Sequence, residues 1–234
     1  GDIGVGGREI GYLFGQYRKL RGAYENGVLT GKARSFGGSL IRPEATGFGA
    51  VYYLESVMKH EHDTLEGKTV AVAGFGNVAW GVVQKLSELG AKPVTLSGPD
   101  GYIYDPDGIT TKEKFDFMLE MRASGRNKVQ DYADKFGCKF VAGDKPWGEK
   151  VDIIMPCATQ NDVDLTQAKR IVANNIKYYI EVANMPTTNE ALRFLMDQKN
   201  MVVAPSKAVN AGGVLVSALE MSQNSERISW TAKE

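Results

Sequence analysis

The sequence predicts an α/β fold, an open, doubly wound and mostly parallel sheet with helices on both faces, and three observations support it. Short apolar runs alternate with segments of helical periodicity along most of the chain. The apolar run at residues 68–73 leads directly into Gly74-Phe75-Gly76-Asn77-Val78-Ala79. Several later runs end in small, amide or hydroxyl residues, and ligands bind beyond the carboxyl ends of the strands in such sheets.

The Gly-x-Gly-x-x-Ala turn is the most informative motif. Apolar residues at helical spacing follow it over residues 78–89, and Gly90 suits the end of that helix. Strand, glycine turn and helix in this order form the dinucleotide-binding fingerprint of Rossmann-like folds. Gly74 permits the tight turn, Gly76 lets the backbone approach a pyrophosphate, and Ala79 allows close packing. The free N–H groups of the helix would hold the phosphates; a purely structural turn is the alternative.

Composition narrows the function classes. The chain has 234 residues, 43% of them hydrophobic, which is enough for one large α/β domain or for one and a half domains of ordinary size. The formal net charge is zero and basic residues are dispersed, so nothing indicates nucleic-acid binding. We expect no membrane partner and a cytoplasmic location, because the sequence has neither a membrane-spanning apolar run nor a recognisable signal peptide. Cys138 and Cys157 lie outside any metal-binding spacing and are predicted to be free thiols.

Two helices are predicted before the fingerprint. Apolar stripes place them at residues 8–20 and from Thr46, as a helix cap, to about residue 59. A polar, glycine-rich loop lies between them. His60-Glu61-His62-Asp63 resembles a metal cluster, but residues two apart face different ways at a helix end, so we predict no metal site.

The second strand of the sheet is predicted at residues 91–97, followed by a turn at 98–101. In dinucleotide folds this strand end meets the adenosine ribose, which places Ser97 nearest to it. Asp100 lies just beyond and is either a ribose contact or an ordinary turn residue. The turn contains no Arg or Lys for a 2′-phosphate, which favours NAD over NADP.

The rest of the chain alternates between the two patterns. After a β-like excursion at 102–107, strands are predicted at 139–142, 151–155, 178–182 and 201–204, and helices at 111–122, 128–136, 166–174, 188–198 and 207–223. Three strand ends, at 156–161, 183–187 and 205–213, offer amides, hydroxyls and room for a nicotinamide ring. Each alone is better explained as a loop with a helix cap, but three in one sheet favour a site.

Several stretches together resemble the hexameric glutamate dehydrogenases, and specifically the small bacterial type. They occur in the family's order and span nearly the whole chain: Gly1-Asp2-Ile3-Gly4, Thr30-Gly31-Lys32, Gly37-Gly38-Ser39, Arg42-Pro43-Glu44-Ala45-Thr46-Gly47, Gly74-Phe75-Gly76-Asn77-Val78-Ala79, Ala183-Asn184-Met185-Pro186-Thr187 and Asn210-Ala211-Gly212-Gly213-Val214. The resemblance implies an amino-acid oxidoreductase that converts L-glutamate, NAD and water to 2-oxoglutarate, ammonium and NADH. It also implies a homohexamer for the full-length enzyme.

The resemblance assigns roles to individual residues. Asp2 matches the catalytic aspartate that moves protons to and from the substrate, a task suited to a carboxylate in a closed cleft. Arg42, Val214 and Ser217 match substrate-binding positions. The cofactor-binding positions are matched by Thr46, Gly74, Phe75, Gly76, Asn77, Val78, Ser97, Cys157, Ala158, Asn184 and Asn210.

The resemblance also predicts how the chain is organised. Residues 1–40 correspond to a lead-in segment from the end of the substrate domain and the linker, and residues 41–234 to the NAD(P)-binding domain. The glycine-rich motif whose lysines bind the substrate in the family is absent from this sequence, as are the family's final helices. We therefore expect this chain to bind a dinucleotide with little or no turnover.

Two alternatives stay open. A non-catalytic nucleotide-binding module would keep the fold without the chemistry, but it would need none of the substrate-facing residues such as Asp2 and Ser217. A dehydrogenase of leucine, phenylalanine or valine would share the cofactor residues. Ser217 favours glutamate, because a hydroxyl suits a carboxylate side chain and is unfavourable in an apolar pocket.

Overall fold

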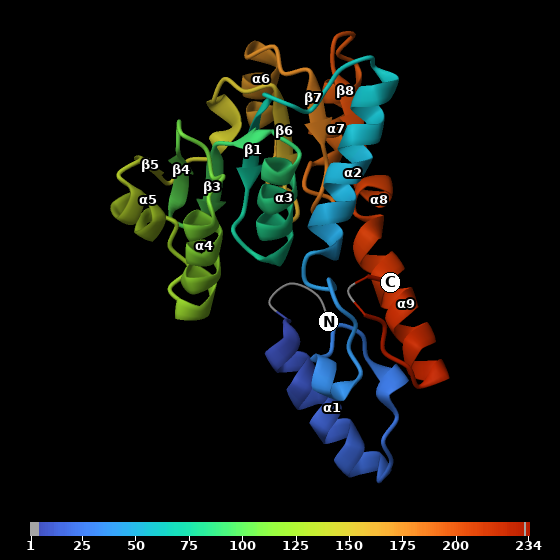
Figure 1. Cartoon of the computed structure of the whole chain (residues 1–234). Helices are drawn as coiled ribbons and strands as arrows, with labels where there is room; N and C mark the ends of the chain where they lie inside the picture. Colours follow the sequence, from blue (N-terminus) through green and yellow to red (C-terminus); the bar gives the residue numbers. More distant parts are fainter. Residues whose placement is uncertain (1–4, 232) are drawn as a thin grey trace.

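The computed structural model describes residues 5–231 and 233–234 and confirms the predicted fold. Its main sheet is entirely parallel, with the strand order β2-β1-β6-β7-β8. The strands are β1 (Thr69–Ala73), β2 (Lys92–Pro93), β6 (Ile153–Pro156), β7 (Tyr178–Ile180) and β8 (Val202–Ala204). Figure 1 shows this sheet in the upper part of the molecule, with the first helix and its loops forming a lower part.

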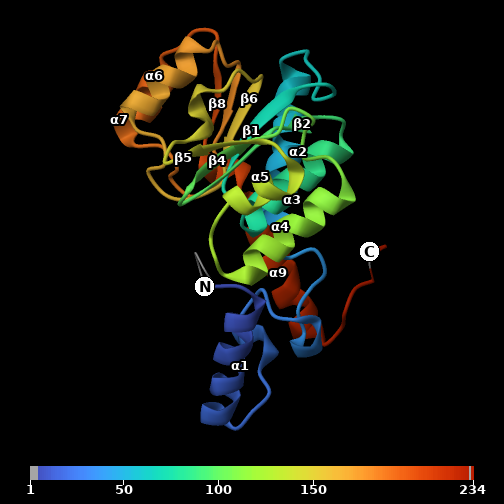
Figure 2. The same ribbon diagram turned by 90° about the vertical axis from the view of Figure 1, so that its left-hand side faces the viewer.

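Helices cover both faces of this sheet. They are α2 (Ala45–His60) and α3 (Asn77–Glu88) on one face, and α6 (Leu165–Ala173) and α7 (Asn189–Met196) on the other (Figure 2). Side chains of β1 alternate between the two cores: Val70 and Val72 pack on the side of α2 and α3, and Ala71 and Ala73 on the side of α6 and α7. Both faces are therefore buried, which explains why these strands are apolar throughout.

The predicted second strand at 91–97 is divided between two sheets. Its first part, β2, pairs with β1, and its second part, β3 (Thr95–Gly98), joins an antiparallel sheet with β4 (Gly101–Tyr104) and β5 (Lys139–Ala142). The main-chain ladder ends at Val94, whose N–H donates to the Val70 carbonyl at 2.9 Å. Beyond it the Thr95 hydroxyl hydrogen-bonds both the N–H and the carbonyl of Val72, each at 2.9 Å. A side chain thus replaces the ladder and releases the backbone to turn away.

The antiparallel sheet carries two helices, α4 (Lys112–Ser124) and α5 (Gln130–Phe136). Tyr132 of α5 is fully buried and packs against Phe117 and Phe136, with ring centroids 6.3 and 4.6 Å away. A short 3-10 helix, η3 (Pro146–Gly148), buries Trp147 and leads back to β6. The strand predicted at 139–142 therefore exists, but it runs antiparallel to its neighbour and lies outside the main sheet.

The lower part of the molecule consists of α1 (Gly7–Arg21), η1 (Asn26–Val28) and η2 (Arg34–Phe36). Phe14 is its centre: the side chain is 1% exposed and its ring lies 5.4 Å from Tyr24 and 5.7 Å from Phe36. This part packs against the C-terminal helix (Figure 1). The division at residue 40 between a lead-in segment and the NAD(P)-binding domain stays a prediction.

The long helix predicted at 207–223 is two helices, α8 (Ser206–Val209) and α9 (Ala211–Glu226). Asn210 separates them with a non-helical backbone, at φ −93° and ψ 11°. The break has a packing cause. A Cβ atom on Gly212 would lie 2.4 Å from the Ala45 carbonyl oxygen, so α9 lies directly on the α2 backbone and takes its direction from α2. Among the described residues, no helix combines the length and the apolar character needed to cross a membrane.

Candidate functional site

The glycine turn between β1 and α3 has the backbone that the fingerprint predicts. Gly74 has φ +89°, and a Cβ atom there would lie 3.2 Å from both the Ala158 Cα and the Cys157 carbonyl oxygen. Gly76 is the N-cap residue of α3, and a Cβ atom built on it meets nothing within 4 Å. The turn is therefore closed on the side of β6 and open above Gly76, where the first N–H groups of α3 begin.

The ends of neighbouring strands meet this turn. The Cys157 N–H donates to the Ala73 carbonyl at 3.2 Å, and the Ala183 N–H donates to the Pro156 carbonyl at 2.9 Å. Cys157, Ala158 and Asn184 thus come together at the carboxyl edge of the sheet. Burial raises the pKa of the Cys157 thiol, so at neutral pH it is a neutral wall residue rather than a nucleophile.

The side chains of Ser97 and Asp100, where the adenosine ribose is predicted to bind, make hydrogen bonds within the protein. Ser97 is 1% exposed and its hydroxyl accepts from the Gly74 N–H at 2.9 Å, so it fixes the glycine turn. The Asp100 carboxylate accepts from the N–H groups of Val129 and Gln130 at 3.0 and 3.1 Å. Of the two interpretations of Asp100, the structural one accounts for both of its oxygens.

The contact of Asp100 with Val129 and Gln130 also brings the loop at 125–129 to the ribose end, which no local pattern in the sequence predicts. The loop at 125–129 carries Arg126, which pairs with Asp131 at 2.5 Å, and the exposed Lys128. The two cations lie more than 25 positions from Asp100 in the chain, and no local pattern links them. The absence of cations in the 98–101 turn is therefore a weaker argument for NAD than the sequence alone made it.

The substrate-side residues gather where α2 meets α9. The Arg42 Nε donates to the Ser217 hydroxyl at 2.8 Å. A Cβ atom on Gly213 would lie 2.2 Å from the Thr46 hydroxyl, and one on Gly47 would lie 2.5 Å from the Val82 nitrogen of α3. These close approaches place Arg42, Thr46 and Ser217 beside one another and bring the start of α2 against the start of α3.

Thr46 does not cap its helix, contrary to prediction. It lies within α2, whose N-cap is Glu44, and its hydroxyl faces Gly213 of α9. A capping residue precedes the first helical turn, whereas this threonine is already part of it. The hydroxyl is consequently available to the site rather than used by the helix end.

Two asparagines connect the strand ends to α9. The Asn210 Nδ2 donates to the Asn184 Oδ1 at 2.8 Å, across 26 positions of sequence. Val214 follows on α9 and is 73% exposed, three residues before Ser217 and therefore close to the same helix face. Most of the described site residues thus fall into two groups: a turn group of residues 74–78 with Ser97, Cys157 and Ala158, and a substrate group of Arg42, Thr46 and Ser217. Asp2 lies outside the described residues.

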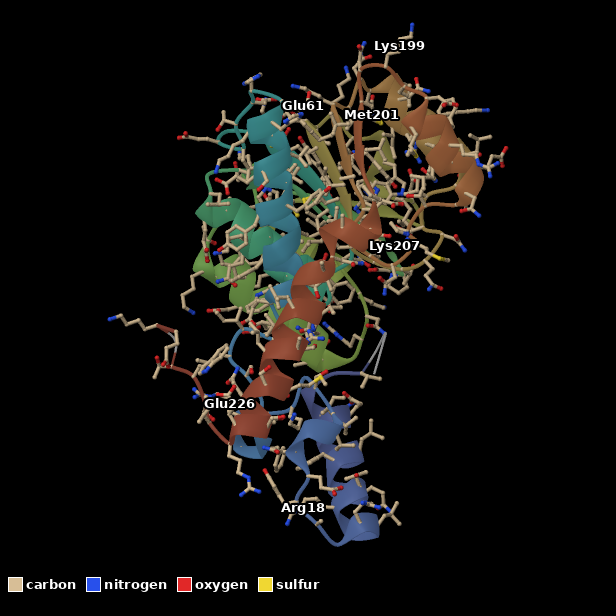
Figure 3. The ribbon with its side chains drawn as sticks, turned by 90° about the vertical axis from the view of Figure 1, so that its right-hand side faces the viewer. Arg18, Glu61, Lys199, Met201, Lys207 and Glu226 are labelled. Carbon is tan, nitrogen blue, oxygen red and sulfur yellow. The ribbon has the colours of Figure 1, made fainter. Side chains whose placement is uncertain are left out.

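The surface of the described residues has hollows elsewhere. One lies beside Arg18 and Tyr24, and another beside Glu61, Lys199 and Met201 (Figure 3). Neither includes a predicted site residue.

No group of three or more His, Cys, Asp and Glu within the described ranges is arranged to hold a metal ion. In the segment 60–63, the Asp63 carboxylate instead interacts with two lysine side chains and a tyrosine hydroxyl. Its carboxylate accepts from the Lys177 ammonium and the Tyr178 hydroxyl, both at 3.0 Å, and pairs with Lys68 at 3.1 Å. The Lys177 hydrogen bond above all holds the pKa of Asp63 well below its usual range.

The parallel sheet, the glycine turn and the amide-bearing strand ends define the class: an α/β protein with a Rossmann-like sheet and the dinucleotide fingerprint. A family model described as Glutamate/Leucine/Phenylalanine/Valine dehydrogenase matches residues 37–234. The chain belongs to this family.

Comparisons with individual proteins confirm the resemblance to glutamate dehydrogenases. The chain is 82% identical over 234 residues to the NAD-specific glutamate dehydrogenase of Clostridium symbiosum and 56% identical over 235 residues to that of Bacteroides fragilis; it covers 52% of each. The NADP-specific enzyme of Escherichia coli is 48% identical over 234 residues.

Solved structures agree with these relatives. One glutamate dehydrogenase matches with a TM-score of 0.97 at 82% identity, and the Plasmodium falciparum enzyme with 0.92 at 45%. Both matches cover 100% of this chain, and 52% and 50% of the solved chains. The chain therefore spans about half the length of the relatives it matches.

Proposed function

We propose that this chain is the coenzyme-binding part of an NAD-dependent glutamate dehydrogenase. The open backbone above Gly76, at the start of α3, is the observation that carries the proposal. It leaves the N–H groups of a helix terminus accessible beside the converging strand ends, the arrangement that a pyrophosphate requires. The residues present therefore fit a dinucleotide.

NAD is the coenzyme that we propose. The relatives at 82% and 56% identity are named NAD-specific, whereas those named NADP-specific are 49% and 48% identical. The turn at 98–101 has no cation for a 2′-phosphate. Because Arg126 and Lys128 lie on the adjoining loop, NADP is the comparison ligand that any binding test must include.

The proposed mechanism assigns roles to five described residues and to Asp2. The nicotinamide, when bound, supplies the acceptor for the hydride from the substrate Cα. Asn184, Asn210 and Thr46 provide amide and hydroxyl groups that orient a carboxamide and the substrate amine. Arg42 and Ser217 hold a substrate carboxylate between a guanidinium and a hydroxyl. Asp2 is proposed to move protons to and from the substrate nitrogen and the attacking water.

Glutamate is the substrate that we propose, with 2-oxoglutarate and ammonium as products. Leucine, phenylalanine or valine would require an apolar environment for the side chain. The Arg42–Ser217 pair favours a second carboxylate, because a hydrocarbon side chain against it would leave the other N–H groups of the Arg42 guanidinium without acceptors. Comparing glutamate with leucine as substrates of the complete enzyme separates the two.

For the chain of 234 residues by itself we propose dinucleotide binding with little or no turnover. The lysines that the resemblance assigns to substrate binding are not among its residues. The complete enzyme is proposed to be a cytoplasmic homohexamer, as the resemblance implies. A purely nucleotide-binding module is the competing hypothesis.

Calorimetric titration of the chain with NAD and with NADP tests the proposal. We expect NAD to bind and NADP to bind more weakly, and incubation with glutamate and NAD to produce little NADH. Failure of both dinucleotides to bind would overturn the coenzyme-binding role. Rapid NADH formation would show that the substrate-binding groups are already complete in this chain.

A further inference from the structure

Helix α9 carries a buried polar face near its C-terminal end. Glu220 is fully buried, and Gln223 and Asn224 are each 6% exposed. Their spacing of three and four residues puts them on one side of the helix. Charged and amide side chains are rarely buried to this degree without specific partners, so this face must be matched by polar groups of another segment.

The Trp230 N–H donates to the Gln223 Oε1 at 3.3 Å, and the other hydrogen-bond partners of this face lie in the segment 29–39 of the lower part. The Glu220 carboxylate accepts from the Gly31 N–H at 2.9 Å and the Lys32 N–H at 3.4 Å, and it pairs with the Lys32 Nζ at 2.6 Å. The Lys32 ammonium also donates to the Leu29 carbonyl. Both side chains of the ion pair are 0% exposed. A single helix residue thus holds two consecutive amides and a lysine.

Two further hydrogen bonds extend the contact. The Gln223 Nε2 donates to the Ser39 hydroxyl at 2.8 Å, and the Asn224 Nδ2 donates to the Gly37 carbonyl at 2.6 Å. The segment is folded tightly on itself, because a Cβ atom on Gly38 would lie 1.8 Å from the Lys32 carbonyl oxygen. We call these contacts between residues 220–224 and residues 29–39 the α9 clamp.

Both halves of the α9 clamp, the segment 29–39 and the helix α9, lead directly to Arg42 and Ser217 of the substrate group. In the chain, Ser39 precedes Arg42 by only three residues. On the helix, Ser217 lies one turn before Glu220 and accepts the Arg42 hydrogen bond at 2.8 Å. The same helix therefore holds the segment and receives the guanidinium that follows it. Figure 3 shows α8 and α9 running from Lys207 near the sheet to Glu226 beside the lower part.

We propose that Glu220 is a positioning residue, which fixes the segment 29–39 on α9 and so sets Arg42 against Ser217. This inference rests on the proposed function, in which that pair binds a substrate carboxylate. A buried ion pair is weak evidence for stability, since apolar residues of similar size often stabilise a fold as well. The hydrogen bonds of Glu220 to Gly31 and Lys32 are directional, so they instead fix a single position of the segment 29–39 along α9.

The test uses the complete enzyme with Glu220→Gln. The amide keeps the shape of the side chain but removes the charge that binds Lys32. We expect the KM for glutamate to rise about tenfold, the loss associated with a displaced charged hydrogen bond. The Kd for NADH, followed by fluorescence, should stay within about twofold, because the glycine turn is not attached to the α9 clamp. Glu226→Gln, on the exposed last turn of the same helix, is the matched control and should change neither value.

A second variant covers the case in which Glu220→Gln does not fold. Gln223→Ala removes the bond to Ser39 without leaving a buried charge, and should raise the KM in the same direction by about threefold. A crystal structure of either variant should show the Arg42–Ser217 pair beyond hydrogen-bond distance. An unchanged KM with an intact Arg42–Ser217 bond overturns the inference, as does a parallel weakening of NADH and glutamate.

The crystallographic measurement also separates this inference from the proposed function. If the unmodified enzyme does not oxidise glutamate, the proposed function fails. The displacement of Arg42 in the variants still decides whether Glu220 positions it.

Discussion

At the scale of single residues, Gly74 shows how tightly the turn is constrained. Its backbone conformation disfavours any side chain, and the space for a Cβ atom is limited by the backbone of Ala158. We expect Gly74→Ala to destabilise the fold by about 2–3 kcal/mol, from conformational strain plus crowding, and to weaken NAD binding. Denaturant unfolding and calorimetry measure the two effects.

Gly67→Ala is the matched control for this substitution. Gly67 has a similar φ of +77°, but a Cβ atom there would meet nothing within 4 Å. The cost should be about 1 kcal/mol, and NAD binding should not change. Equal losses in the two variants would mean that strain, and not the approach of the strand ends, governs the turn.

Asp63 predicts a pH dependence of stability. Because Lys177 and its other partners lower the pKa of Asp63 in the folded state, the unfolded chain binds the proton more readily. The stabilisation is therefore complete above the ordinary carboxyl pKa of about 3.9 and is lost as the pH falls below it. We expect Asp63→Asn to cost about 1–3 kcal/mol at pH 7 and progressively less below pH ~4. Urea unfolding at several pH values measures the difference.

The exposed Asp134 provides the comparison for that experiment. Asp134→Asn should leave the unfolding free energy nearly unchanged across the same pH range. A constant gap between wild type and Asp63→Asn down to pH 2 would contradict the expectation, because protonation would then not remove the carboxylate interactions.

At the scale of elements, the junction between β2 and β3 depends on one hydroxyl. Thr95 is fully buried and hydrogen-bonds both main-chain groups of Val72. Thr95→Val keeps the shape but leaves two buried polar groups without partners, so we expect a loss of about 2–4 kcal/mol by denaturant unfolding. Thr110→Val, at an exposed threonine, should cost little. Similar costs at the two sites would indicate that water satisfies Val72 in the variant.

The same junction shows what the sequence could and could not predict. Amphipathic stripes located α1, α2 and α3 to within one or two residues, because burial of one face determines where such helices lie. The division at Val94 and the break at Asn210 were missed, since each results from a contact with a distant segment. The apolar pattern of the predicted strand continues past Val94, and that of the predicted helix continues past Asn210, so neither interruption is visible in the sequence.

The candidate site divides in the same way. The glycine turn follows from local sequence, whereas the Arg42–Ser217 and Lys32–Glu220 pairs join positions 175 and 188 apart. No periodicity relates such residues, so only the resemblance to a family could nominate Ser217. Nothing in the sequence nominated Glu220, which on a helix pattern is an ordinary surface residue.

At the scale of the whole molecule, coenzyme binding should be coupled to stability. A ligand that binds only the folded chain stabilises it by about 2.7 kcal/mol at 100 times its Kd. For a domain of this size that corresponds to a rise in Tm of roughly 5–10 °C, which thermal unfolding followed by circular dichroism detects. The open edge above Gly76 lies between β1, α3 and the strand ends, so binding there links elements from both halves of the sheet.

We therefore expect a single unfolding transition whose midpoint rises as a whole when NAD is added. NADP at the same concentration should move it less, and Gly74→Ala should reduce the shift because it weakens NAD binding. A transition that splits into two upon addition of NAD would show that the lower part, with α1, unfolds independently of the sheet.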